Sequence, residues 1–140
     1  MINVAHWRDV PAAAWRWKDF TPEEMACRSD GSLKIEEAFM DKLQALRDAC
    51  QMALPVTSGY RSPAHNAAVS HTGETGPHTT GRAVDLNVFG FKAFRIMALA
   101  PTLGFTGIGL DQKGPSEKRI IHLDDLPAAD GQPRPCVWSY

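Results

Sequence analysis

Three side chains in the second half of this sequence, His78, Asp85 and His122, could together bind one metal ion. Asp85 lies in the alternating segment 82–88, which predicts a strand, and His78 precedes that segment in a loop. His122 lies in a second predicted strand, 118–123. Two imidazoles and a carboxylate are a frequent ligand set for catalytic zinc, because three protein ligands leave a fourth coordination position open. These residue types therefore allow a zinc site.

The residues alone leave an alternative open. A single histidine is more often structural or exposed to solvent than a metal ligand. The sequence contains five histidines, which are His6, His65, His71, His78 and His122. Spacing alone does not decide between a metal site and a set of structural histidines.

Three short motifs surround these residues. Residues 58–66 read Ser-Gly-Tyr-Arg-Ser-Pro-Ala-His-Asn, residues 78–85 read His-Thr-Thr-Gly-Arg-Ala-Val-Asp, and residues 121–124 read Ile-His-Leu-Asp. In this order they resemble the zinc D-alanyl-D-alanine carboxypeptidase family, which includes phage-borne lytic peptidases. The similarity extends from about Phe20 to the C-terminus.

The resemblance implies both a metal and a reaction. It implies that His78, Asp85 and His122 bind Zn²⁺, and that Gly81 and Ala83 are small so that loop and strand can approach the metal. The expected function is hydrolysis of an amide bond in the stem peptides of bacterial peptidoglycan, by a D-Ala-D-Ala carboxypeptidase or a related endopeptidase, in phage-associated lysis.

The resemblance also implies substrate contacts. Arg61 is expected to bind substrate near the scissile bond, a role that suits a planar guanidinium. Without the motif, Arg61 would be interpreted as a surface arginine paired with a carboxylate. Ser58 and Tyr60 share the motif and are further candidates for substrate binding. His71, in a glycine-rich loop, is a minor candidate.

Two positions depart from the family pattern. Gly76 stands where many relatives carry serine, so a hydrogen bond near the site is expected to be missing. Arg119 stands three residues before His122, where several relatives place the general-base carboxylate. The acidic residues that compete for this catalytic role are Asp124, Glu117 and Asp111, in that order of preference, because Asp124 shares a strand face with His122. Asp125 should face the opposite way.

Arg119 also permits a second function, that of a metal-stabilised peptidoglycan-binding module without turnover. A hydrolase with a cysteine nucleophile is a weaker alternative, because none of Cys27, Cys50 and Cys136 lies in a glycine-rich or histidine-flanked context. The odd number and wide spacing of these cysteines also exclude a disulfide framework.

The composition argues against nucleic acid and membrane as partners. The 140 residues carry a net charge of -1, which gives no bulk attraction to nucleic acid. No segment has the apolar length of a membrane span or the form of a signal peptide. We therefore expect a monomer with a peptidoglycan peptide substrate and neither nucleic acid nor membrane as a partner. It would be made in the cytoplasm and act at the cell wall after release or as part of a virion.

The predicted elements give an α+β fold. It is a single domain with a mainly antiparallel sheet flanked by helices and a zinc site on the sheet face. Residues 1–20 are expected to form an irregular, tryptophan-rich arm that docks through its aromatic rings, and residues 21–140 the peptidase domain. The predicted helices are 21–28, 35–52, 63–69 and 91–100, and the predicted strands are 54–60, 82–88, 105–110, 118–123 and 137–140. Residues 70–81 are expected to form a loop.

Overall fold

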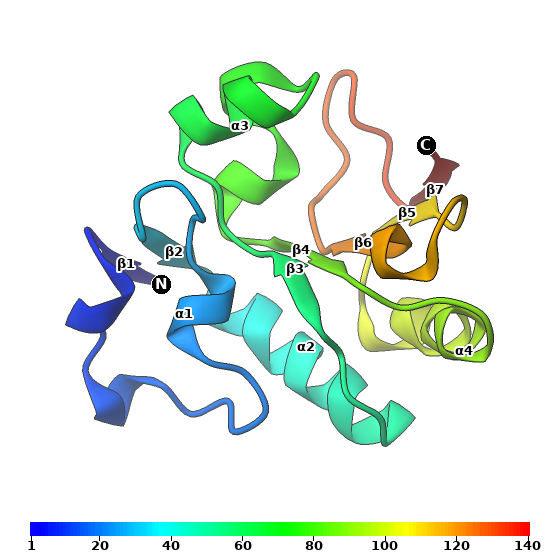
Figure 1. Cartoon of the computed structure of the whole chain (residues 1–140), viewed down its shortest axis with the longest axis horizontal. Helices are drawn as coiled ribbons and strands as arrows, with labels where there is room; N and C mark the ends of the chain where they lie inside the picture. Colours follow the sequence, from blue (N-terminus) through cyan, green and yellow to red (C-terminus); the bar gives the residue numbers. More distant parts are fainter.

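A five-stranded sheet forms the centre of the molecule in the computed structural model, which describes residues 1–140 (Figure 1). Its strands are β3 (Val56–Ser58), β4 (Ala83–Leu86), β6 (Ile120–Asp124), β5 (Gly107–Asp111) and β7 (Cys136–Ser139), in that spatial order. The first four strands pair antiparallel, and β7 pairs parallel with β5. The sheet is therefore mixed, with one parallel edge.

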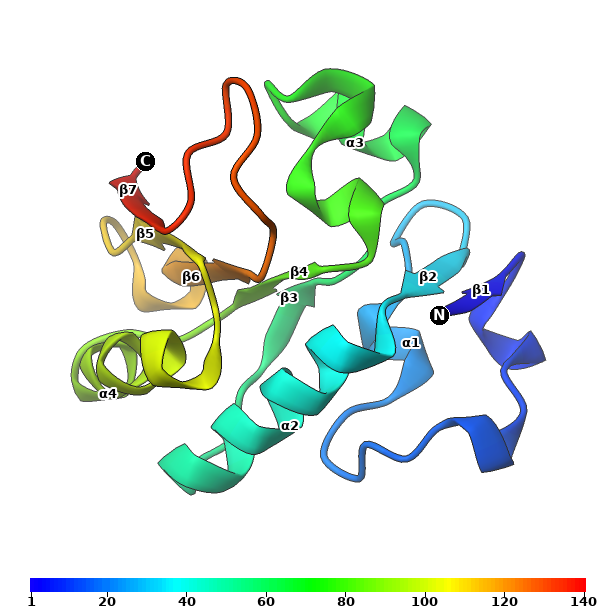
Figure 2. The same cartoon turned by 180° about the vertical axis from the view of Figure 1, so that it is seen from behind.

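Four helices flank this sheet (Figure 2). They are α1 (Pro22–Met25), α2 (Glu37–Cys50), α3 (Pro63–Val69) and α4 (Phe91–Leu99). The predicted N-cap is present at α1, because the Thr21 hydroxyl accepts from the Glu24 N–H. The reciprocal bond of a capping box is replaced by one from the Thr21 hydroxyl to the Glu24 carboxylate. None of the helices is long and apolar enough to cross a bilayer.

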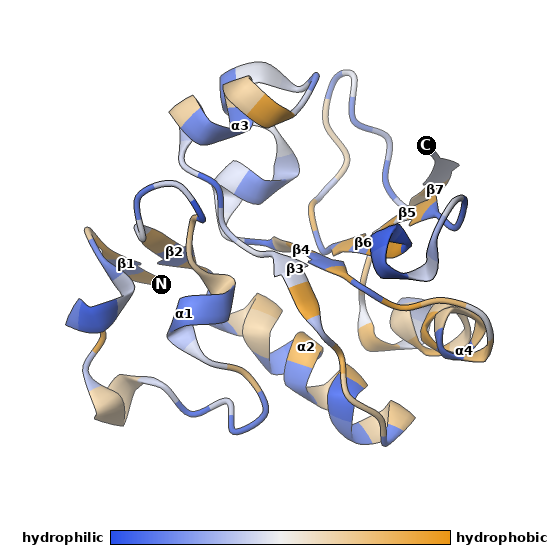
Figure 3. Cartoon of the chain, in the orientation of Figure 1, coloured by the Kyte–Doolittle hydropathy of each residue, from blue (hydrophilic) through white to orange (hydrophobic).

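The start of α2 differs from the prediction. The helix begins at Glu37, and Ile35 ends the strand β2 (Leu33–Ile35) instead. Phe39, Leu43 and Leu46 are buried as predicted, whereas Ala49 is exposed and Cys50 is buried in its place. Figure 3 shows the resulting mixture of apolar and hydrophilic stretches along α2.

The N-terminal segment is more regular than predicted. Strand β1 (Ile2–Val4) pairs antiparallel with β2, so the arm is not irregular throughout. Trp17 and Phe20 are buried members of the hydrophobic core. Long-range pairing of this kind leaves no periodic signal in the sequence, because each strand has only three residues. The division of the chain at residue 20 stays a prediction.

The two faces of the central sheet have different roles. Val84, Leu86, Ile121 and Leu123 point to the face that packs into the hydrophobic core with residues of α2 and α4. Because side chains alternate along a strand, Asp85 and His122 point to the other face. The face opposite α2 and α4 therefore carries the polar site.

Candidate metal centre

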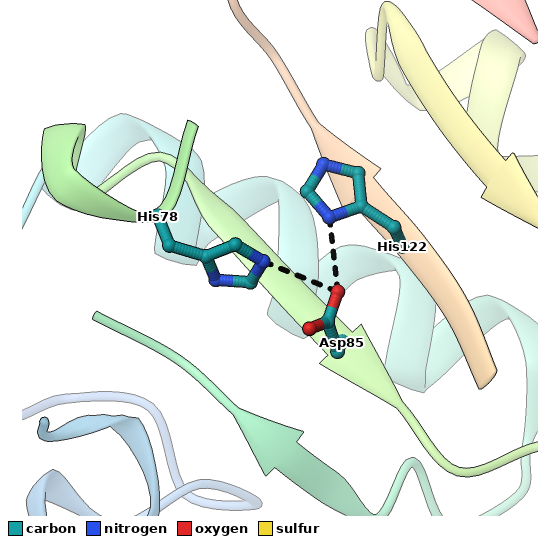
Figure 4. Close-up of side chains that lie close together, drawn as sticks. All are labelled: His78, Asp85 and His122. Carbon is teal, nitrogen blue, oxygen red and sulfur yellow. Dashed lines mark hydrogen bonds and ion pairs between the residues drawn. The ribbon is translucent and has the colours of Figure 1, made fainter. Parts of the chain in front are cut away.

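The strand register brings the predicted ligands together. Asp85 of β4 lies directly opposite His122 of β6, so both side chains project from the same face. His78 lies in a 3₁₀ helix, Pro77–Thr80, within the segment that was predicted to be a loop. Gly81 follows with a φ of +77°, a left-handed conformation that suits glycine, and turns the chain into β4. Figure 4 shows both imidazoles turned toward one Asp85 oxygen.

The three ligand atoms lie within 4.8 Å of one another, close enough to share one metal ion. His78 Nε2 lies 3.2 Å from Asp85 Oδ1, and His122 Nδ1 lies 2.9 Å from the same oxygen. A tetrahedral ion with bonds of about 2.0–2.2 Å holds its ligand atoms roughly 3.3 Å apart. All three residues are buried, so solvent screens their charges poorly.

The hydrogen bonds of His78 leave one nitrogen free for a cation. His78 Nδ1 lies 2.7 Å from the Gly59 carbonyl oxygen, which can only accept, so Nδ1 carries the proton. Burial lowers the pKa of His78 despite the attraction of Asp85, which favours the neutral ring. The Nε2 lone pair of a neutral ring then faces the lone pairs of Asp85 Oδ1. A cation between the two atoms removes this repulsion.

A hydrogen bond to Asp124 orients the His122 ring, on the side of the ring away from Asp85. Its Nε2 donates to Asp124 Oδ2 at 3.0 Å, which directs Nδ1 toward Asp85. Arg134 holds Asp124 through two hydrogen bonds, from Nε to Oδ1 at 2.8 Å and from Nη2 to Oδ2 at 2.6 Å. A carboxylate behind a ligating histidine fixes its tautomer and increases its basicity. Asp124 is therefore placed to orient a metal ligand.

The second oxygen of Asp85 is bound by Arg61. Arg61 Nη2 donates to Asp85 Oδ2 at 2.7 Å, and Nε donates to Ser58 Oγ at 2.8 Å. Arg61 Nη1 also lies 3.4 Å from Asn66 Oδ1. These contacts leave Oδ1 of Asp85 free for a metal and add a positioning role to the predicted substrate role of Arg61.

Burial and hydrogen bonds shift the pKa values of Asp85 and His122. Although burial alone would raise it, the pKa of Asp85 is held far below its usual range by His78 and His122. Burial alone would lower the pKa of His122, but hydrogen bonds with Asp124 and Asp85 raise it. Below this raised pKa, metal-free His122 carries a second proton that a bound cation must replace.

A cavity of about 690 Å³ opens over the cluster. Its lining includes His78, Asp85 and His122 together with Arg61 and the predicted candidate His71. Its volume lies within the range of small-molecule and peptide pockets. The candidate metal centre thus lies in the wall of a cleft that an extended peptide could enter.

Most of the other predicted site residues lie outside this cavity. Ser58 is bound to Arg61, and Tyr60 packs against the hydrophobic core. Glu117 is exposed in a 3₁₀ turn, Ser116–Lys118, and does not line the cavity. By contrast, Asp111, the third acidic candidate, does line it. The catalytic and substrate-binding roles of these residues stay predictions.

Contacts with neighbouring residues explain why Gly81 and Gly76 have no side chain. A side chain at Gly81 would collide with the backbone carbonyl of Lys34 on β2, so this position is small because of a backbone contact away from the metal. A side chain at Gly76 would meet the Thr72 hydroxyl and would lie 2.8 Å from Asn66 Nδ2. The Asn66 amide already donates to Thr72 Oγ1 and to the Gly73 carbonyl. Glycine at position 76 therefore leaves room for these hydrogen bonds.

The C-terminal segment supplies cavity residues that the sequence did not predict for the site, among them Arg134, Trp138 and Tyr140. The Trp138 ring lies 5.3 Å from the His122 ring, between centroids, and covers Gly109, where an added Cβ would come within 2.7 Å of the indole. The Arg134 guanidinium lies 5.1 Å from the Trp138 ring centroid. The glycine at position 109 was the available signal, since glycine inside a strand often marks a close approach.

A buried cluster of two histidines and an aspartate in an open cleft has the ligand types of a catalytic metal site. A model of the family Peptidase M15 matches residues 18–124, which is more than half of the chain and includes all three predicted ligands. The chain belongs to this family of zinc D-Ala-D-Ala carboxypeptidase type and is a metallopeptidase. Neither a search of curated proteins nor a search of solved structures returned a match.

Proposed function

We propose that this protein hydrolyses an amide bond in the stem peptides of bacterial peptidoglycan, as a D-Ala-D-Ala carboxypeptidase or a related endopeptidase, in phage-associated lysis. The observation that carries this proposal is the convergence of His78, Asp85 and His122 on one point in the wall of the cleft. Membership of the M15 family supports a zinc peptidase that acts on peptidoglycan.

Each residue of the cluster has a distinct role in the proposed reaction. His78 Nε2, Asp85 Oδ1 and His122 Nδ1 would hold Zn²⁺, which supplies Lewis acidity to the scissile carbonyl when bound. Asp124 keeps His122 in its ligating tautomer. Arg61 fixes Asp85 and also lines the cleft, where a guanidinium is suited to bind a substrate carbonyl or carboxylate.

The test is digestion of purified peptidoglycan by the zinc-loaded protein, followed by mass spectrometry of the released muropeptides. We expect a product that lacks one amino acid or one peptide fragment, formed with zinc and abolished by a chelator. A His122→Ala variant is the matched negative control. Peptidoglycan that is bound but never cleaved would support the second candidate, a binding module without turnover.

Arg119 favours that second candidate, because it stands where several relatives place the catalytic carboxylate. We propose that the protein acts as a monomer at the cell wall, either after release from the cytoplasm or as part of a virion. Fractionation of lysates and purified virions with an antibody to the protein tests this location.

A further inference from the structure

One carboxylate in the cleft has no partner. Asp85 and Asp111 are the two acidic residues that line the cavity. Asp85 contacts both imidazoles and Arg61. The Asp111 carboxylate, at the end of β5, forms no ion pair or hydrogen bond within the chain, although the side chain is half-buried.

The surroundings of Asp111 combine charge with apolar surface. Asp111 lies opposite Ile120 in the β5–β6 register, and Ile120 is two residues before His122 on the same face. Tyr140 continues β7 beside β5, where its backbone N–H donates to the Leu110 carbonyl at 3.0 Å. Asp111, Ile120 and Tyr140 all line the cavity. Ile120 therefore places an aliphatic surface beside the unpaired negative charge, and the Tyr140 ring lines the same cavity.

No cation of the chain is available to Asp111 in the cleft. The two arginines of the lining are already paired, Arg61 with Asp85 at 2.7 Å and Arg134 with Asp124 at 2.6 Å. A peptide that covers the cleft removes water from Asp111. An unpaired carboxylate that loses water is costly, so the peptide itself must supply the compensating positive group.

We propose that Asp111, Ile120 and Tyr140 form a subsite for the side chain of a diamino acid with a free ammonium group. Its methylene stem would lie along Ile120 and Tyr140, and its ammonium group would bind Asp111. This proposal rests on the proposed function, because stem peptides carry such a diamino acid, whose second amine is free until it is cross-linked. The protein would therefore prefer stem peptides that are not cross-linked at that residue.

The test compares two synthetic peptides, L-Ala-γ-D-Glu-L-Lys-D-Ala-D-Ala and the same peptide acetylated on the lysine side chain. Zinc-loaded wild-type protein is compared with Asp111→Asn and with Asp130→Asn. Asp130 is a matched control, because it is exposed, has no partner and does not line the cavity. Where a peptide is cleaved, KM and kcat are measured, and where it is not, isothermal titration gives the dissociation constant.

We expect wild type and Asp130→Asn to bind the free-amine peptide about tenfold or more tightly than the acetylated one, since a charged hydrogen bond is lost on acetylation. Asp111→Asn should lose this preference, because its KM or Kd for the free-amine peptide should rise toward the value for the acetylated peptide. Its kcat should stay nearly unchanged. Amine-selective binding without cleavage would retain the subsite and refute the proposed hydrolysis. A preference unchanged in Asp111→Asn would overturn the subsite. An equal fall of kcat on both peptides would do the same, because it would assign Asp111 to proton transfer.

Discussion

Two buried aspartates, Asp85 and Asp125, are neutralised in different ways. Asp125 receives a cation on each oxygen, from Lys42 Nζ at 2.6 Å and from Arg82 Nε at 2.7 Å. Asp85 receives one permanent cation, Arg61, on Oδ2, while Oδ1 faces two imidazoles. The Asp125 cluster is electrostatically complete without any further group, whereas the Asp85 cluster becomes complete when a metal binds. Burial of a carboxylate alone therefore does not mark a metal site.

The largest expected effect comes from removing a ligand of the incomplete cluster. His78→Ala or His122→Ala should abolish both turnover and zinc binding, because two remaining ligands cannot complete a catalytic zinc site. Zinc content by elemental analysis and peptidoglycan hydrolysis are the measurements. His65→Ala is the control, since His65 does not line the cleft. Full zinc occupancy in His122→Ala would refute the assignment of this ligand.

Arg61→Lys should reduce turnover by about 10- to 100-fold while zinc stays bound. The reason is that a lysine ammonium cannot keep the contacts with Asp85 and Ser58 and also meet the substrate. Steady-state kinetics on muropeptides, with zinc content measured in the same samples, test this. Wild-type turnover in Arg61→Lys would show that Arg61 has only a structural role.

Substitutions of the neighbouring residues Asp124 and Asp125 should affect different properties of the protein. Asp124→Asn should weaken zinc binding by about 10- to 100-fold, because the support behind His122 is lost. Asp125→Asn should leave zinc affinity unchanged and lower the free energy of unfolding by about 1–3 kcal/mol, because Lys42 and Arg82 lose a charged partner. Competition titrations with a chelating dye and urea unfolding measure the two quantities.

If Asp124 is instead the general base, Asp124→Asn should lose turnover at full zinc occupancy. Glu117→Gln provides the parallel comparison for the exposed carboxylate. A loss of turnover in Glu117→Gln alone would show that the 3₁₀ turn moves over the cleft.

The resemblance of three short motifs implied the ligand set, because the evidence within each motif is local. His78 and Asp85 are separated by one turn and part of one strand, and each motif lies within a few residues. The period of two also placed Asp124 on the same face as His122, which the hydrogen bond between them confirms. The alternation of β6 similarly separated Asp125 from Asp124, and Asp125 does bind a different pair of residues.

The rest of the cleft depends on contacts between distant segments. Strand β7 pairs parallel with β5, and this pairing brings Trp138 over Gly109. Arg134 reaches Asp124 from a loop with no periodic pattern. Such contacts have no characteristic spacing in one sequence, and the family match ends at residue 124, before these residues. Ile35 was assigned to a helix because its spacing fits the stripe of α2, but pairing with β1 places it in a strand.

A pH dependence follows from the raised pKa of His122. Below that pKa the metal-free site holds a proton that zinc must displace, so zinc affinity should fall as pH decreases, by up to about tenfold per unit. Isothermal titration near pH 7 in buffers of different ionisation enthalpy should detect proton release on zinc binding. The same titrations on Asp125→Asn should give the wild-type proton release.

The metal centre is tested most directly by the zinc stoichiometry of the purified protein, measured by equilibrium dialysis and elemental analysis at neutral pH. We predict one Zn²⁺ per chain in wild type and in Asp125→Asn, and none in a variant that combines His78→Ala with His122→Ala. A wild-type protein that binds no zinc, or a double variant that still binds one equivalent, would contradict the assignment of His78, Asp85 and His122 as the metal centre.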